Sequence, residues 1–348
     1  MNSLIVKPVS SAHEFEKAYA LALSVFSENS TIDHYNDHKK LTWTKDPYSG
    51  YQNILLARYG DEYAGLVRIV PRILYRGSRS YSVAGISSVC LLPSLRGKGF
   101  SVPLMDQSLT YCSERGYDFA FLFARRAADH YYTRFGFHGV AAYAKIFVKK
   151  NGASLTDTSF SLGEMDVSQI SLYAAAYEKS YQNCFGRIER SDAYWHFLLG
   201  SLGSRNDCQF KTIRKEGVVI GYMVYNTKRI LEIALVPDVP GEDLVGFLLD
   251  AKLFEPVTDM LELEILPQHS LVGRLKGMDI TFQQRECNYG GHMLKIINRT
   301  KMFGADIPEK NSYSYEETCR MMGIFSPCSG NDSQVGALPF DISFIDQF

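Results

Sequence analysis

The chain has 348 residues, 46% of them hydrophobic and 22% charged, a composition ordinary for a globular protein and a length sufficient for two domains. Its 37 basic and 38 acidic side chains give a net charge of −1, so there is no basic excess with which to neutralise nucleic-acid phosphates. The longest apolar runs are too short to cross a bilayer and no signal-peptide pattern is seen, so we expect a cytoplasmic protein that binds neither nucleic acid nor membrane.

The first half of the chain predicts a mixed α/β unit. Apolar residues at helical spacing indicate helices, and apolar runs ended by Gly or Pro indicate strands. In chain order the expected elements are a strand at 5–8, a helix at 12–26, a hairpin of strands at 54–59 and 64–70, a strand at 81–92, a helix at 102–115, a strand at 118–124, a short helix at 127–135 and a strand at 140–149.

The second half repeats this pattern weakly. Gly221 has the same place relative to its hairpin turn as Gly65, and the strand after it ends at Pro237 as the earlier one ends at Pro93. The expected elements are strands at 209–213, 218–225 and 230–236, a helix at 244–253 and a strand at 260–266. We therefore expect a duplicated α/β unit with a polar linker at 150–169, giving domains at 1–150 and 165–304 and a C-terminal tail at 305–348.

The strongest candidate for a ligand site is the loop 96–101 between a strand and a helix. Its two glycines let the backbone turn tightly and approach a ligand, and the helix that follows offers unpaired N–H groups at its positive end. Arg96 and Lys98 add positive charge, so the loop favours a pyrophosphate. The alternative is a plain basic turn before a helix. The glycine spacing fits neither a dinucleotide fingerprint nor a Walker A loop.

Two segments resemble motifs of the GCN5-related (GNAT) N-acetyltransferases. Residues 89–101, VCLLPSLRGKGFS, resemble the family's acyl-CoA motif, with Ser101 where the family prefers Gly or Ala. Downstream, 132–137, YTRFGF, resembles the family's Tyr-x-x-x-Gly-Phe. Two motifs in the expected order, each in a fitting strand–loop–helix context, indicate an α/β fold with tandem GNAT-like units, of which the first is intact and the second degenerate.

The tandem layout and the segment 292–297, HMLKII, resemble the enhanced-intracellular-survival (Eis) type of acetyltransferase. Members of that type acetylate amines, including those of aminoglycosides, and they often assemble, so a homo-oligomer is one expected form. The family carries a third, sterol-carrier-like domain, for which 305–348 is too short, so we expect this chain to lack a full third domain.

The resemblance implies acetyl-CoA as the acyl donor and no metal. Tyr132 matches the family's general acid for the departing thiolate, with a packed aromatic as the alternative role. The carboxylate of Phe348 would be the general base, with a surface-docked tail as the alternative. The residues expected to hold the pantetheine and pyrophosphate are Val89, Cys90, Leu91, Arg96, Gly97, Lys98, Gly99, Phe100, Ser101 and Val102. The matching segment of the second unit, 237–243, has three carboxylates and no Lys or Arg, so we expect no second CoA site there.

Other features carry weaker signals. The seven cysteines include no C-x-x-C pair, so we expect reduced thiols. His34 and His38 have the spacing of two metal ligands on a helix, but no third ligand is evident and a solvated segment is favoured. By resemblance, this segment could also form the rim of the acceptor site, where Asp33, Asp37 and Trp43 would meet a cationic amine.

The sequence therefore predicts an acetyl-CoA-dependent N-acetyltransferase acting on a primary amine of a small molecule that is aminoglycoside-, polyamine- or amino-sugar-like. One alternative keeps the enzyme but gives it a protein lysine or N-terminal amine as acceptor. Another is a non-catalytic acyl-CoA-binding regulatory protein on the same fold, and a third is a generic nucleotide site. Acceptor choice depends on loops that sequence patterns do not place.

Overall fold

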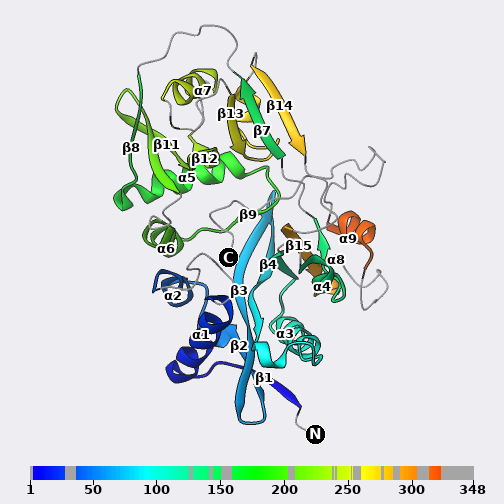
Figure 1. Ribbon diagram of the computed structural model, residues 1–348. Helices are drawn as coiled ribbons and strands as arrows, with labels where there is room; N and C mark the ends of the chain where they lie inside the picture. The colour runs from blue at the N-terminus through cyan, green and yellow to red at the C-terminus, as the bar shows by residue number, and fades with distance from the viewer. Residues whose placement is uncertain are drawn as a thin grey trace.

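A computed structural model describes residues 3–27, 37–124, 128–140, 144–149, 159–202, 208–236, 239, 241–251, 253, 260–275, 278–284, 291–303 and 313–322. Two mixed β-sheets organise these residues, one in the lower and one in the upper half of Figure 1. None of the helices in these ranges is long and apolar enough to cross a membrane.

The first sheet has the strand order β1-β2-β3-β4-β5-β15-β6, and the short β9 pairs with β3. Helices α1 and α2 cover one face and α3 and α4 the other (Figure 1). The strands are β1 (Leu4–Pro8), β2 (Ile54–Tyr59), β3 (Glu62–Arg76), β4 (Arg79–Leu91), β5 (Phe119–Ala124), β6 (His138–Gly139), β9 (Arg187–Ile188) and β15 (Gly291–Ile296). The helices are α1 (Ala12–Ser27), α2 (Asp37–Thr44), α3 (Ser101–Glu114), α4 (Asp129–Thr133), α8 (Arg299–Phe303) and α9 (Tyr315–Met322).

The second sheet has the order β14-β7-β13-β12-β11-β10-β8, with α7 on one face and α5 and α6 on the other. Its strands are β7 (Ala144–Lys149), β8 (Phe160–Glu164), β10 (Gln209–Lys215), β11 (Val218–Tyr225), β12 (Ile230–Leu235), β13 (Met260–Glu264) and β14 (Asp279–Gln284). Its helices are α5 (Ile170–Tyr181), α6 (Asp192–Leu202) and α7 (Gly241–Asp250). Because β8 occupies 160–164, that part of the expected linker is a strand.

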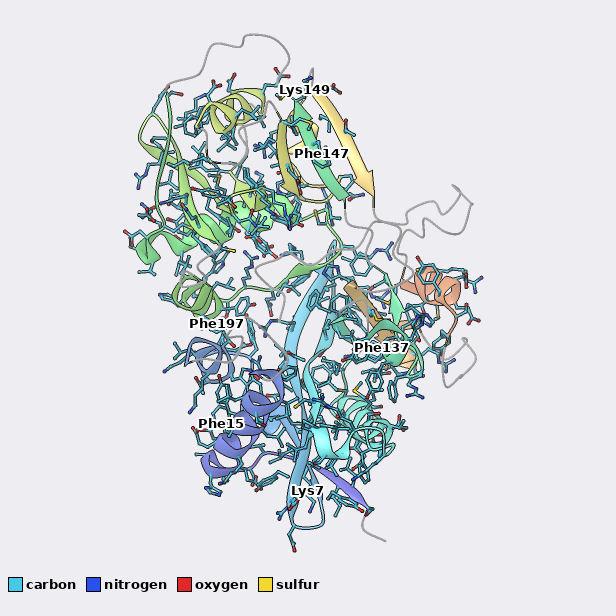
Figure 2. The ribbon with its side chains drawn as sticks, viewed as in Figure 1. Lys7, Phe15, Phe137, Phe147, Lys149 and Phe197 are labelled. Carbon is cyan, nitrogen blue, oxygen red and sulfur yellow. The ribbon has the colours of Figure 1, made fainter. Side chains whose placement is uncertain are left out.

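Side chains of the first sheet fill a core under α1, a core under α3 and a third core that includes Met302 of α8 and Met322 of α9. Phe15 of α1 is buried in the core on one face, and Phe137, next to α4, is buried in the core on the other (Figure 2). Leu66 and Val67, adjacent on β3, point to opposite cores, as the alternation of a strand requires. The expected run at 118–124 is indeed a central strand, since β5 pairs with β4 on one side and β15 on the other.

The two hairpins repeat one backbone detail. Gly65 and Gly221 each lie where the next strand comes so close that a Cβ atom would collide with a carbonyl oxygen, at 2.4 Å from Cys90 O and 2.1 Å from Ala234 O. Each hairpin then continues with an equivalent hydrogen bond: Leu92 N–H to Ala64 O at 2.9 Å, and Val236 N–H to Ile220 O at 2.8 Å. The duplication expected from the sequence is therefore confirmed.

The two sheets exchange strands. β7 follows the first unit in the chain but pairs with β13 and β14 in the second sheet. β15 comes from the second half but lies between β5 and β6 in the first sheet. The ranges 1–150, 165–304 and 305–348 stay a prediction for domains, but the sheets do not follow them: residues 144–149, expected to complete the first unit, belong to the second sheet. The physical reason is that a strand's local pattern does not encode its partner.

Candidate active site

Strands β4 and β5 separate beside a bulge in β4. Their parallel ladder ends at Ile86, opposite Leu122, while β4 continues to Leu91. On its other edge, β4 sets Ser88 and Val89 against the single Val67 of β3, and Ser88 has a φ of 52°. A bulge takes one residue out of the ladder and re-aims the backbone. Beyond Ile86, the edge of β4 that faces β5 has no ladder partner among the described strands and can hydrogen-bond an extended ligand.

The glycine loop joins this strand to the N-terminus of α3. Gly97 and Gly99 have φ angles of 74° and 82°, and a Cβ on either would meet nothing within 4 Å. The loop therefore needs glycine for its backbone conformation, not for space. Arg96 and Lys98 are exposed. At the start of α3, the N–H groups of Val102 and Leu104 donate to the carbonyl oxygens of Gly99 and Phe100, each at 3.2 Å, so the N–H of Ser101, the first helical residue, is the one left for an anion. The arrangement is an open, positively charged cradle at a helix N-terminus.

Two aromatic side chains hold this loop and α4 against the core of the first sheet. The ring of Phe100 packs against Tyr59 with centroids 4.7 Å apart. The hydroxyl of Tyr131 donates a hydrogen bond to the carbonyl oxygen of Ser101 at 3.0 Å. This bond fixes α4 beside the start of α3, so the second sequence motif lies next to the first.

Side chains of the expected pantetheine-binding strand point into the two cores. Cys90 faces the core under α1, and Leu91 faces the core under α3. Burial raises the pKa of the Cys90 thiol to about 12, so it stays protonated at neutral pH and is no nucleophile. The five cysteines in the described ranges are buried free thiols, as expected for those five; Cys287 and Cys328 lie outside these ranges.

Tyr132 lies on α4, stacked edge-on against Tyr131 with centroids 5.0 Å apart. Burial raises its pKa to about 12, so the phenol carries its proton at neutral pH. Within the part of the chain that the structure describes, its hydroxyl has no hydrogen-bond partner, whereas that of Tyr131 is committed to Ser101. Tyr132 is thus a protonated donor without a partner. Its raised pKa makes complete proton transfer to a thiolate unfavourable.

The rest of the second motif turns the chain. Gly136 has a φ of 81°, and its N–H donates to the carbonyl of Thr133 at 2.9 Å, which ends α4. Phe135 and Phe137 on either side are buried in the core under α3. Gly136, Phe135 and Phe137 therefore serve the fold. Tyr132 is the residue of this motif that can take part in a reaction.

The matching segment of the second unit is differently built. Helix α7 begins at Gly241, where a Cβ would lie 2.8 Å from the carbonyl oxygen of Arg274, and Glu242 and Asp243 fill its first turn. Protein backbone and two carboxylates thus occupy the position at which the first unit presents its cradle. Pro237, Asp238 and Pro240 lie outside the described residues.

Several predicted residues have a different setting or cannot be compared. Trp43 is only 3% exposed and packs edge-on against Tyr19, with the guanidinium of Arg68 over its ring at 5.4 Å, so it belongs to the core under α1 and not to an acceptor rim. Phe348, Asp33 and His34 lie outside the described residues, as do the side chains of Asp37 and His38 in α2. No three His, Cys, Asp or Glu side chains in the described ranges are grouped to hold a metal ion.

Sequence reasoning missed a polar cleft at the other end of α3. It has a volume of about 820 Å³, and Arg134, Lys295 and Arg299 are among its lining residues. These three lie on different elements, and no local pattern links them. That Arg134 lies near Lys295 and Arg299 could have been predicted only by knowing that β15 joins the first sheet.

The splayed strands, the bulge and the glycine loop at a helix N-terminus define an acyl-CoA-binding fold of the GNAT class. Residues 6–140 match the family model described as an acetyltransferase (GNAT) domain. The matched first unit is an acetyltransferase (GNAT) domain, so the chain is an acyltransferase, and its two sheets are consistent with tandem GNAT-like units.

Solved structures share the fold over most of the chain. They include a GCN5-related N-acetyltransferase from Anabaena variabilis, with a TM-score of 0.63, 16% identity and coverage of 86% of this chain and 74% of that one. Eis1 from Mycobacterium abscessus has a TM-score of 0.58, 17% identity and coverage of 86% and 75%. A tandem GNAT protein from the clavulanic acid biosynthesis pathway has a TM-score of 0.51, 11% identity and coverage of 85% and 99%. No curated protein sequence matches the chain.

Proposed function

We propose that the chain transfers the acetyl group of acetyl-CoA to a primary amine of a small molecule that is aminoglycoside-, polyamine- or amino-sugar-like. One observation carries this proposal: the β4 bulge, the glycine loop and Tyr132, whose hydroxyl has no hydrogen-bond partner among the described residues, all border the same core. Val89, Phe100 and Tyr132 all pack against the same core under α3. A thioester arm along β4 with its pyrophosphate at Gly97–Ser101 would therefore carry its sulfur toward α4.

In the proposed reaction, the amine nitrogen attacks the thioester carbonyl carbon, the C–S bond breaks and the amine loses one proton. The products are an amide and the CoA thiol. The backbone of β4 at Val89–Leu91 would orient the thioester and polarise its carbonyl. Tyr132 would donate a hydrogen bond to the departing sulfur. Because an alkyl amine has a pKa near 10.4, delivering it neutral at pH 7 costs about 4–5 kcal/mol, so a base is required. By resemblance, the carboxylate of Phe348 is the proposed base.

The first test is thermal unfolding with and without saturating acetyl-CoA, with ATP as control. A ligand at a hundred times its Kd adds roughly 2.7 kcal/mol to the native state, which is a shift of several degrees. We expect that shift with acetyl-CoA and not with ATP. Arg96→Glu reverses the charge of the cradle and is expected to remove the shift, while Lys7→Glu, on β1, makes the same charge change as a control.

The second test measures CoA thiol release with a panel of polyamines, aminoglycosides, amino sugars and lysine peptides. Turnover with a small amine supports the proposal. Turnover with peptides alone would replace the acceptor by a protein. A thermal shift without turnover on any amine would indicate a non-catalytic acyl-CoA-binding protein, and equal shifts with ATP and acetyl-CoA would indicate a general nucleotide site.

A further inference from the structure

The cleft missed by sequence reasoning lies against the C-terminal part of α3, away from the glycine loop. Its volume is about 820 Å³, and α3 contributes Asp106, Thr110 and Ser113 to its wall. From Ser101, Asp106 is roughly 8 Å and Thr110 roughly 14 Å along the helix axis. The cleft therefore begins about one and a half turns from the proposed pyrophosphate cradle and extends away from it.

Three cationic side chains line this cleft against one anionic side chain. Arg134 comes from the turn after α4, Lys295 from β15 and Arg299 from α8, and the opposing charge is Asp106. None of the three cations forms an ion pair with another residue in the described ranges, although Lys301, two residues beyond Arg299, pairs with Asp118 at 3.0 Å. The cleft thus has an excess of uncompensated positive charge.

Two donor atoms of the Arg299 guanidinium lack acceptors among the described residues. Its Nε and Nη1 atoms are shielded from solvent, and no described residue accepts a hydrogen bond from either. Leaving such donors unsatisfied is unfavourable, and a bound anion would compensate both the charge and the donors. Burial lowers the pKa of Lys295, which is the direction expected for a cation that lacks a close anionic partner; the carboxylate of Asp106 opposes the effect.

Neutral donors complete the wall. The hydroxyls of Ser113 and Thr300 and the amide of Asn298 line the same cleft, whereas the hydroxyl of Thr110, also in the wall, donates to the carbonyl oxygen of Asp106 at 3.0 Å. An Arg and Lys cluster with hydroxyl donors suits the three terminal oxygens of a phosphate ester, which accept several charge-assisted hydrogen bonds.

We propose that this cleft binds a phosphomonoester through Arg134, Lys295 and Arg299. Two sources carry that group: the 3′-phosphate of CoA itself, reaching from the cradle along α3, or a separate phosphorylated ligand. The first source deepens and rests on the proposed function, and the second does not. Lys295 and Arg299 belong to the segment that the second half of the chain lends to the first sheet, so the site exists only because the strands are exchanged.

The test is calorimetric titration of the full chain with CoA and with 3′-dephospho-CoA. Arg299→Gln removes the charge from the cleft, and Lys301→Gln removes one charge from the same helix outside the cleft. If the phosphate is that of CoA, CoA binds about tenfold tighter than dephospho-CoA, Arg299→Gln abolishes that difference and Lys301→Gln keeps it. Arg299→Lys, which restores the charge, is expected to recover part of it.

If CoA and dephospho-CoA bind alike, inorganic phosphate is titrated into the CoA-saturated protein. Binding that Arg299→Gln removes and Lys301→Gln retains assigns the cleft to a separate phosphorylated ligand. Equal CoA affinities together with no phosphate binding overturn the proposal. If the parent chain binds no CoA but does bind phosphate through Arg299, the proposed function is wrong and the phosphate site in the cleft is supported. The melting temperature of each variant without ligand verifies folding.

Discussion

The adjacent tyrosines of α4 should separate chemistry from stability. The hydroxyl of Tyr131 donates to Ser101 O at 3.0 Å, so Tyr131→Phe removes one hydrogen bond and costs about 0.5–1.5 kcal/mol of unfolding free energy. At roughly 2–4 °C per kcal/mol, the melting temperature falls by about 1–6 °C. The hydroxyl of Tyr132 has no partner in the described ranges, so Tyr132→Phe should leave the melting temperature unchanged or raise it slightly.

The effect on turnover should be the reverse. With a pKa of about 12 for Tyr132 and near 8.5 for a thiol, complete proton transfer to the leaving thiolate would be uphill by about 5 kcal/mol. Tyr132 therefore acts as a hydrogen-bond donor to a partly formed thiolate. Because a thiolate is already a fair leaving group, we expect kcat to fall about a hundredfold in Tyr132→Phe, the lower end of the range for acid catalysis, with KM for acetyl-CoA little changed.

The assay is the initial rate of CoA thiol release at saturating acetyl-CoA and amine, combined with the melting temperature of each variant. Tyr131→Phe should keep kcat within a few-fold of the parent. A Tyr132→Phe protein with parental kcat and a melting temperature lowered by several degrees would refute the reasoning, since the ring would then be a packing residue. Because the phenol stays protonated well above neutral pH, any loss of rate below pH 10 must come from another group.

Three further predictions concern stability and are measured by denaturant unfolding. Arg190 and Glu232 form a fully buried ion pair with an N–O distance of 2.7 Å, so Glu232→Gln leaves a buried charge and should cost about 3–5 kcal/mol; a cost below 1 kcal/mol would contradict this. Burial lowers the pKa of the His292 imidazole from 6.5 to about 3. Below pH 6.5 the unfolded chain therefore binds a proton that the folded chain does not, and the free energy of unfolding falls by up to about 1.4 kcal/mol per pH unit as the pH drops from 6.5 toward 3. His292→Leu should remove that slope. In Gly65→Ala the new Cβ would lie 2.4 Å from Cys90 O, so we expect a cost of about 1–3 kcal/mol and weaker acetyl-CoA binding, and a stable variant with parental affinity would show that β4 can shift freely.

The cradle could be predicted from the sequence because its determinants are local. Gly97 and Gly99 have the positive φ angles that their spacing suggested, and the helix begins at Ser101, within one residue of the expected start. The Gly65 and Gly221 equivalence was also visible, because each glycine is fixed by its own hairpin. These features depend on residues within a few positions of one another.

The features that the sequence did not reveal depend on partners far along the chain. The apolar pattern of β7 fits any sheet, and only the packed structure shows that Ile146 and Val148 are buried in the second. By resemblance, Trp43 could have lain at the rim of the acceptor site, but its ring packs against Phe15 and Tyr19 of α1, and aromatic burial outweighs the polarity of the surrounding segment. The cleft cations come together only after β15 joins the first sheet.

The exchange of strands between the sheets gives the second unit a structural role, although it has no glycine loop like that of the first unit. Met293 of β15 is fully buried in the core under α3, the same core against which Tyr132 packs. The two halves also meet through Tyr48, whose hydroxyl bonds to the side-chain oxygen of Ser191 at 2.9 Å, and through Arg72, whose guanidinium lies 4.7 Å from the ring centre of Tyr194. Removing the second half would therefore take the strand between β5 and β6 out of the first sheet and open the core beneath the proposed site. The second unit is thus a structural part of the first.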